Sequence, residues 1–214
     1  MASVTYEDHG DGEPLVLLHG FGGGADDWRH VFDLPQLPYR VIRWNARVRL
    51  PQAHRRCAID LIELLDELGL DRVRAIGMSM GGNTLLHAAT IAPSRIDAMV
   101  IVSATTHFGP EARAIMRAAP QPEPRAWAES DDEMSFTPDD LSRITAKTLV
   151  VAGDRDPLYP IAIAHDMARA IPNAELHVVE GGGHGPIFGA DAPAFAAKAL
   201  AFLRDRTRAR RRRP

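Results

Sequence analysis

A single serine stands between two glycines in the stretch Gly77-Met78-Ser79-Met80-Gly81. The residues before it, RVRAIG, have the apolar pattern of a strand, and the residues after it, GGNTLLHAAT, that of a helix. A tight turn between them would expose the Ser79 hydroxyl at the end of the strand. Such a turn needs glycine on both sides, because a Cβ at either position would collide with neighbouring backbone. The pattern therefore predicts that Ser79 is a nucleophile.

A serine hydroxyl is a poor nucleophile unless a base accepts its proton. Among nine histidines, His184 lies in the glycine-rich stretch VVEGGGHGPIF directly after the last predicted strand. Such a loop can carry an imidazole across the end of a sheet to the serine. His107, which also follows a predicted strand, is the second candidate. Solvated or packed roles are expected for His9, His54, His87 and His177.

The base needs an acid that orients it, and two aspartates follow another predicted strand in the stretch TLVVAGDRDPLYP. Asp156 precedes Pro157, which favours an extended backbone and gives the carboxylate a fixed direction. We therefore expect Asp156 to orient His184. Asp154 is expected to serve in the turn or behind the first acid.

Acyl transfer at a serine also requires N–H donors for the oxyanion. The stretch LLHGFGGGADDW follows a predicted strand and joins His19 and Gly20 to the glycines at 22–24, so that a backbone amide can face the serine. A nucleotide-binding loop is the alternative. GFGGG has neither the G-x-G-x-x-G spacing nor the lysine of a P-loop, which disfavours that alternative.

These residues need a scaffold, and short apolar runs bounded by turn residues supply one. The predicted strands are PLVLLHG, YRVIRW, RVRAIG, DAMVIVSA, KTLVVAG and AELHVVEGG. Their near-continuous apolar character is typical of strands covered on both faces. Together with the amphipathic segments between them, they predict an α/β fold with a mostly parallel sheet and helices on both faces. The polar start SVTYEDHG predicts an antiparallel edge strand.

Four segments predict the helices that follow strands. In AIDLIELLDELGL, leucines recur at the i, i+3, i+4 and i+7 spacing of one helix face, and Gly69 ends the run. MGGNTLLHAATIAP and IAIAHDMARAIP end before a proline. APAFAAKALAFLRD is the last helix, with Asp191 as its expected N-cap. The leucines of the first segment are Leu61, Leu64, Leu65 and Leu68.

The stretch 105–146 interrupts this alternation. It is rich in proline, alanine and acids, carries no strand pattern, and predicts two or three short helices that form a small lid. Its large apolar side chains either line a substrate pocket or pack inside the lid itself. These candidates are Phe108, Met116, Trp127, Met134 and Phe136, and Phe21 and Met80 would complete the apolar lining.

Length and composition fit a single domain over residues 1–206: the chain has 214 residues, of which 45% are hydrophobic and 25% charged. No apolar run approaches the roughly 20 residues of a membrane helix. The N-terminal stretch MASVTYEDHGDGEP is polar and acidic, unlike a secretory signal. Cys57 is the only cysteine, which excludes an intrachain disulfide and a cysteine-rich metal site. These features favour a cytoplasmic protein.

The formal net charge of −3 conceals a basic C-terminus, because residues 204–214 contain seven arginines and one aspartate. An arginine tail can bind nucleic acid or an acidic membrane. The sequence shows no basic face elsewhere, so we expect residues 207–214 to be a disordered, solvated end and infer no nucleic-acid partner.

The order strand–HGFGGG, strand–GMSMGG–helix, strand–GDRDPLYP, strand–GGGHGP resembles the α/β-hydrolase fold family over about residues 3–206. The resemblance implies Ser79 as nucleophile, His184 as base and Asp156 as the acid that orients it. It also implies oxyanion donors from the backbone N–H groups of Phe21 and Met80. Neither a metal nor an organic cofactor is implied.

Two stretches depart from the family's pattern. After YRVIRW, such proteins commonly read Asp-x-Arg-Gly-x-Gly-x-Ser before a loop and a helix. Here the sequence reads NARVRLPQAHRRCAID, in which Asn45 and Arg47 match the start of the pattern only in part. The loop that follows, which shapes one wall of the site in such proteins, is short here. The insertion of about forty residues is also short for a full helical lid, which suggests a shallow, open site.

The function that this resemblance favours is hydrolysis of carboxylic esters of small or medium acyl chains, through an acyl-enzyme. The expected partner is a small-molecule ester. Lactonase, thioesterase, perhydrolase and carbon–carbon bond hydrolase activities would use the same residues, and the sequence leaves them open. A hydrolase-like protein that binds or senses a small ligand without turnover is the alternative from another class. The oligomeric state is also left open.

Overall fold

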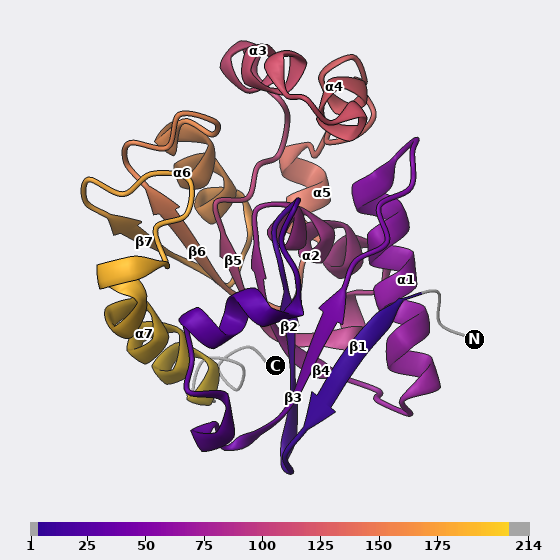
Figure 1. The fold of residues 1–214 in the computed structure, drawn as a ribbon, viewed down its shortest axis with the longest axis vertical. Coiled ribbons are helices and arrows are strands. Elements are labelled where there is room, and N and C mark those ends of the chain that lie inside the picture. The colour runs from indigo at the N-terminus through magenta and orange to yellow at the C-terminus, as the bar shows by residue number, and fades with distance from the viewer. Residues whose placement is uncertain (1–3, 206–214) are drawn as a thin grey trace.

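The computed structural model describes residues 4–205. At its centre is one seven-stranded sheet in the order β1-β3-β2-β4-β5-β6-β7 (Figure 1). All neighbouring strands are parallel except β1 and β3, which confirms the predicted antiparallel edge strand. The strands are β1 (Thr5–His9), β2 (Glu13–Leu18), β3 (Tyr39–Asn45), β4 (Val73–Met78), β5 (Ile96–Val102), β6 (Lys147–Gly153) and β7 (Ala174–Val179).

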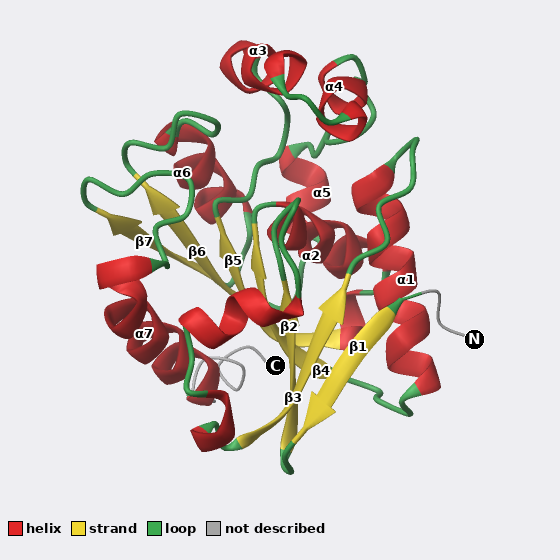
Figure 2. Cartoon of the chain, in the orientation of Figure 1, coloured by secondary structure: helices red, strands yellow, loops and turns green. Residues whose placement is uncertain are grey.

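Helices cover both faces of this sheet (Figure 2), as the sequence predicted. The α-helices are α1 (Ala53–Glu67), α2 (Met80–Ile91), α3 (Pro110–Ala118), α4 (Pro122–Ala128), α5 (Pro138–Ser142), α6 (Ile161–Ala170) and α7 (Ala192–Arg204). One hydrophobic core lies between the sheet and α1, α2 and α6. A second core lies on the opposite face, where α7 and the short 3-10 helix η1 (Ala25–His30) pack. Because both faces are covered, the central strands β4, β5 and β6 are apolar over most of their length, with charged residues only near their starts, at Arg74, Asp97 and Lys147.

The first long helix starts earlier than its leucine pattern indicated. Leu61, Leu64 and Leu65 are buried as predicted, and Leu68 packs at the edge of the same core. The helix nevertheless begins at Ala53, five residues before the predicted segment. In this first turn Arg55 and Arg56 are exposed, and the buried side chains are those of Ala53, His54 and Cys57, so its buried face carries none of the leucines on which the prediction was based.

Three short helices, α3 to α5, lie between β5 and β6, within the predicted insertion 105–146. An antiparallel bridge between His107 and Ser135 joins the chain before α3 to the chain after α4. Figure 1 shows α3 and α4 at the end of the molecule toward which the parallel strands run. That end is where loops of an α/β sheet gather side chains for binding.

Two further sequence predictions concern the C-terminal part. Asp191 is the residue before α7, but its side chain makes no capping hydrogen bond. Its backbone is already helical because the 3-10 helix Gly189–Asp191 runs directly into α7, whereas a capping side chain needs an extended backbone. The predicted disordered end at 207–214 lies outside the described residues. Across residues 4–205, the helices are too short or too polar to span a membrane.

Candidate active site

Ser79 occupies the turn between β4 and α2 in a backbone conformation that non-glycine residues rarely adopt. Its φ is 51° and its ψ is −114°. Two backbone hydrogen bonds hold this turn: Ser79 N–H donates to Val102 O at 2.8 Å, and Asn83 N–H donates to Ser79 O at 2.8 Å. The serine side chain therefore stands at the carboxyl end of a central strand, fixed by the neighbouring strand and by the first turn of α2.

The glycines on either side allow this turn because backbone atoms pack against them. A Cβ on Gly77 would lie 2.4 Å from Gly81 O, and a Cβ on Gly81 would lie 2.2 Å from Leu18 O. Real Cβ atoms do not approach backbone oxygens so closely. A side chain at either glycine would therefore force β2, the Ser79 turn or α2 to move.

Gly81→Ala is therefore expected to lower the free energy of unfolding by about 3 kcal/mol or more, because the clash is with backbone and not with a side chain that can move. Urea denaturation measures the effect. Gly183→Ala is the matched control, since its Cβ would have no heavy atom within 4 Å, and it should change stability by less than about 0.5 kcal/mol. Equal stability of the two variants would contradict this account of the turn.

His184 lies between Ser79 and Asp156. Its Nε2 is 2.9 Å from Ser79 Oγ, and its Nδ1 is 2.8 Å from Asp156 Oδ2. An Nδ1–H that donates to the carboxylate leaves the Nε2 lone pair free to accept from the serine hydroxyl. The second candidate base, His107, is exposed, and its Nδ1 lies 3.1 Å from Thr106 Oγ1.

The carboxylate of Asp156 is held from two sides. Its Oδ1 accepts hydrogen bonds from the backbone N–H groups of Leu158 at 2.7 Å and Tyr159 at 3.1 Å, which leaves Oδ2 for His184. Its side chain is only 1% exposed. Asp154 makes a different contact, because its Oδ1 accepts from Gly181 N–H at 2.7 Å and so ties the loop after β7 to the loop after β6.

The loop after β2 lies against the serine turn, because a Cβ on Gly20 would be 3.6 Å from the Ser79 Cβ. In the described part of the chain, neither the Phe21 N–H nor the Met80 N–H donates a hydrogen bond, so both remain available to a ligand. His19 fixes the start of this loop: its Nδ1–H donates to Gly20 O at 2.7 Å, and its Nε2 accepts from Ala46 N–H at 2.9 Å.

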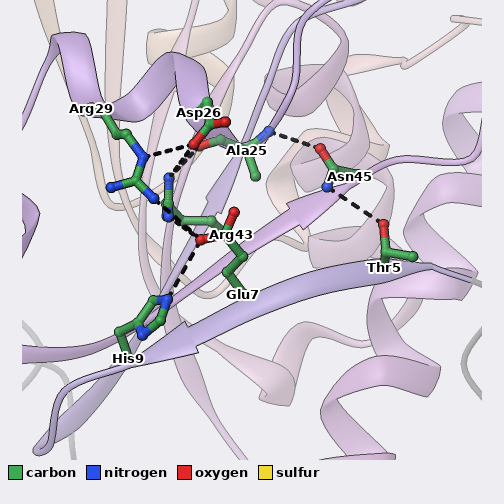
Figure 3. Close-up of polar contacts among 8 residues, drawn as sticks. All are labelled: Thr5, Glu7, His9, Ala25, Asp26, Arg29, Arg43 and Asn45. Atoms are coloured by element: carbon green, nitrogen blue, oxygen red, sulfur yellow. Dashed lines mark hydrogen bonds and ion pairs between the residues drawn. The ribbon is translucent and has the colours of Figure 1, made fainter.

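Two residues of β3 hold the end of the same loop, as Figure 3 shows. Asn45 Oδ1 accepts from Ala25 N–H at 2.9 Å, and Arg43 Nη1 donates to Ala25 O at 2.9 Å. The Arg43 side chain is 1% exposed, and its charge is balanced by Glu7 and Asp26. Both polar groups of Ala25 are thus fixed, which holds the glycine-rich segment that carries Phe21.

Ser79 and His184 open into a cavity of about 320 Å³. Its wall includes Phe21, Met80, Met116 and Trp127 from the predicted lining. Three other predicted residues lie outside it: Phe108 and Met134 are buried in the core, and the Phe136 ring packs 4.7 Å from that of His87. The wall consists of Gly20, Phe21, Gly22, His54, Met78, Ser79, Met80, Ile115, Met116, Ala119, Gln121, Pro124, Trp127, Leu158, Tyr159 and His184.

Two residues of this wall carry no signal in the sequence that would place them there. His54 was expected to be an ordinary solvated or packed helix residue, yet the early start of α1 brings it to the cavity. Tyr159, two residues beyond Pro157, packs edge-on to the His184 ring at 5.1 Å. Burial raises the pKa of the Tyr159 phenol, against the opposing effect of hydrogen bonding to Asn83 and Ser79. The GDRDPLYP motif predicted roles for its two aspartates, but it carried no pattern that predicted a position for Tyr159 in the cavity wall.

Two family models match the chain. One, described as alpha/beta hydrolase fold, matches residues 56–139, and another, described as TAP-like protein, matches residues 121–213. The first match includes the turn at Ser79, and the second includes Asp156 and His184.

Curated relatives align over most of the chain. "Putative carbamate hydrolase RutD" of Stutzerimonas stutzeri is 28% identical, over 85% of this chain and 89% of the relative. Pimeloyl-[acyl-carrier protein] methyl ester esterase of Nitrosomonas europaea is 27% identical, over 85% of this chain and 67% of the relative. The alignment with the first relative runs over 242 positions, more than the 214 residues of this chain, so that relative contains segments this chain lacks.

Solved structures share the fold. The meta-cleavage product hydrolase of Pseudomonas fluorescens superimposes with a TM-score of 0.78, over 94% of this chain and 95% of that chain, at 19% sequence identity. At this level of identity the likeness establishes the arrangement of strands and helices.

Proposed function

Because the chain belongs to the α/β-hydrolase fold family, we propose that it is a serine hydrolase that cleaves carboxylic esters of small or medium acyl chains. One observation carries the proposal: Ser79 Oγ, His184 and Asp156 form an unbroken line of hydrogen bonds at the edge of a cavity. The esterase among the relatives gives independent support for the ester as substrate.

In the first half of the proposed reaction, the Ser79 oxygen attacks the ester carbonyl carbon while His184 Nε2 accepts the hydroxyl proton. Asp156 keeps the imidazole in the tautomer that can accept it and stabilises the imidazolium. The carbonyl oxygen becomes an oxyanion, to which the Phe21 and Met80 N–H groups donate. His184 then gives its proton to the departing alkoxide oxygen, and the acyl group stays on Ser79.

In the second half, water takes the place of the alcohol. His184 Nε2 removes a proton from the water as its oxygen attacks the acyl carbon, and the same N–H groups hold the second oxyanion. Collapse of this intermediate breaks the bond to Ser79 Oγ, which recovers the proton from His184. The products are one carboxylic acid and one alcohol, and the chain's own residues supply every proton transfer.

The insertion 105–146 serves in this proposal as a small lid over the acyl group. Side chains of α3 and α4, among them Met116 and Trp127, contribute to the cavity wall. A cavity of about 320 Å³ is at the small end of the range for ligand sites, which favours short and medium acyl chains over long ones.

Hydrolysis of p-nitrophenyl esters from acetate to palmitate tests the proposal, with wild type and Ser79→Ala measured in parallel. We expect turnover that depends on Ser79, with the highest kcat/KM on short or medium acyl chains. A fluorophosphonate probe should add its phosphonyl group to the wild-type peptide that contains Ser79 and leave the variant unlabelled.

Equal rates in the two proteins, or the absence of both labelling and turnover, would contradict the proposal. Labelling of Ser79 without hydrolysis of any ester would keep the nucleophile and exclude the ester as substrate.

A further inference from the structure

A histidine that the proposed reaction does not use lies in the wall of the same cavity as Ser79. His54, in the first turn of α1, is 1% exposed. Its partner is Glu133, which follows α4 in the insertion and is also 1% exposed. Seventy-nine residues separate the two in the sequence, so α1 and the insertion build this part of the wall together.

Glu133 determines which nitrogen of the His54 ring carries the proton. Glu133 Oε1 lies 2.6 Å from His54 Nδ1 and also accepts from the His54 backbone N–H at 2.9 Å. Burial opposes ionisation of Glu133, but hydrogen bonds from His54 and from the Ala53 N–H outweigh it, so the pKa of Glu133 lies below its usual range. An ionised carboxylate only accepts hydrogen bonds. The ring proton therefore lies on Nδ1, and Nε2 of the neutral ring presents a lone pair that accepts.

The Nε2 atom of His54 is open to a ligand. Among residues 4–205 it has no hydrogen-bond partner, yet solvent reaches it, whereas the unpartnered Nε1 of the adjacent Trp127 is sealed. The imidazole packs 4.7 Å from the Trp127 ring and 5.9 Å from the Phe108 ring, both measured between centroids. An acceptor among such rings has little water to bond to, and a ligand that brings a donor compensates that loss.

The tie between Glu133 and α1 does not by itself require an imidazole at position 54. Glu133 accepts from the first N–H groups of α1, where the residue before the helix, Gln52, makes no side-chain cap. Backbone donors of this kind are present whichever residue follows Ala53. An apolar ring at position 54 would keep that tie and fill the wall, so the second nitrogen of the imidazole has no role in holding the fold.

The neighbours of His54 place it beside the acyl part of the substrate. His184 must protonate the leaving alcohol, so the alcohol lies beside His184. His54 lies instead against Trp127, whose ring meets the Phe21 ring edge-on at 5.0 Å. Phe21 belongs to the loop proposed to hold the carbonyl oxygen, so Trp127 and His54 continue the wall from the oxyanion site and not from the leaving-group base.

We propose that His54 Nε2 accepts a hydrogen bond from a hydroxyl group on the acyl chain, so that the preferred substrates are esters of hydroxy acids. The inference rests on the proposed serine hydrolase and names the substrate class of that site. A hydroxyl donates to the Nε2 lone pair, and because it also accepts, it stays a partner if the ring takes up a second proton. It brings one polar atom to a mainly apolar wall, whereas an amide would bury a second polar atom and an ammonium group a charge.

The test moves a hydroxyl along one acyl chain: methyl 3-, 4-, 5- and 6-hydroxyhexanoate are compared with methyl hexanoate. The initial rate of acid release at constant pH measures hydrolysis alone, because closure of a hydroxy ester to a lactone releases methanol and no proton. Wild type should favour one hydroxy ester over methyl hexanoate by roughly tenfold in kcat/KM, as one buried hydrogen bond gives. No preference at any of these positions would overturn the proposal.

Methoxy esters separate the hydrogen bond from the inductive effect of the oxygen, and this comparison needs no variant. A methoxy oxygen withdraws electrons much as a hydroxyl does, but it has no proton to donate. At the favoured position the methoxy ester should therefore lose the advantage and be hydrolysed no faster than methyl hexanoate. A methoxy ester as good as the hydroxy ester would overturn the proposal, because Nε2 would then not be the acceptor.

Variants locate the preference at the imidazole. Each is judged by the ratio of kcat/KM for the favoured hydroxy ester to that for methyl hexanoate, because a changed wall can alter both rates together. His54→Phe removes Nε2, and His54→Phe/Glu133→Gln also removes the charge that the single change leaves unpaired. Both should bring the ratio to about one. Met116→Leu, a volume-conserving change of another wall residue, is the matched control and should keep the ratio. An unchanged ratio in the double variant would overturn the proposal.

Binding measurements separate this inference from the proposed function. If no ester shows turnover that depends on Ser79, the hydrolase proposal fails, and calorimetry with hexanoate and the same hydroxyhexanoates as free acids still tests the subsite. Ser79→Ala should bind one hydroxy acid roughly tenfold more tightly than hexanoate, and Ser79→Ala/His54→Phe should bind the two equally. Equal binding of all these acids by Ser79→Ala, or binding of none of them, would overturn the subsite.

Discussion

Replacing Ser79 by alanine should lower kcat for ester hydrolysis by roughly 10⁴- to 10⁶-fold, because the variant has no oxygen to form the acyl-enzyme. His184→Ala should lower kcat by a similar factor, since the serine hydroxyl would keep its proton. In the structure His184 Nε2 is 2.9 Å from Ser79 Oγ, so the two side chains are expected to act as one unit.

The double variant Ser79→Ala/His184→Ala gives the sharper result. If the two residues act as one unit, its kcat should be no lower than that of either single variant, whereas independent contributions would multiply. Residual hydrolysis above the rate in buffer would come from the oxyanion donors and from binding alone. The measurement is kcat on the best p-nitrophenyl ester, after purification on unused resin to exclude traces of wild type.

His107→Ala serves as control, because that exposed residue was the other candidate base in the sequence. We expect it to keep kcat within about threefold of wild type. Near-normal turnover in His184→Ala, together with a large loss in His107→Ala, would move the role of base to His107.

The sequence predicted the fold because each signal was local. Apolar runs such as KTLVVAG predicted strands buried on both faces, and β6 is buried along its whole length. The glycines beside Ser79 predicted a turn too tight for a Cβ, and the atoms they face are backbone oxygens. The start of α1 escaped prediction because its buried face carries His54 in place of a leucine, and His54 packs against Glu133 and Trp127 of the insertion, contacts that no local pattern records.

The cavity wall was harder to predict for a related reason. Met116 and Trp127 were indistinguishable by residue type from Phe108 and Met134, yet only the first two line the cavity. Which face of a short helix meets the sheet depends on packing between segments far apart in sequence. The contact of His54 with Glu133 is of the same kind, because each residue alone resembles an ordinary polar residue of a helix or a loop.

Asp156→Asn should lower kcat by roughly 10⁴-fold while the structure around it persists. Asp156 Oδ1 accepts two backbone N–H groups, from Leu158 and Tyr159, and an asparagine oxygen can take the same place. Its NH₂ group would then stand where Oδ2 now meets His184 Nδ1. An NH₂ donor requires Nδ1 to accept, so the ring proton moves to Nε2 and the imidazole can no longer accept from Ser79.

Asp154→Asn is the matched control for this argument, since it makes the same change two residues away. Asp154 Oδ1 accepts from Gly181 N–H, and an asparagine oxygen can replace it without moving a catalytic proton. Its kcat should therefore stay within about threefold of wild type. Thermal unfolding of both variants separates loss of catalysis from loss of structure. A larger fall in kcat for Asp154→Asn than for Asp156→Asn would reverse the two assignments. The aspartate that sets the tautomer of His184 is the one whose replacement by an asparagine NH₂ donor lowers kcat more.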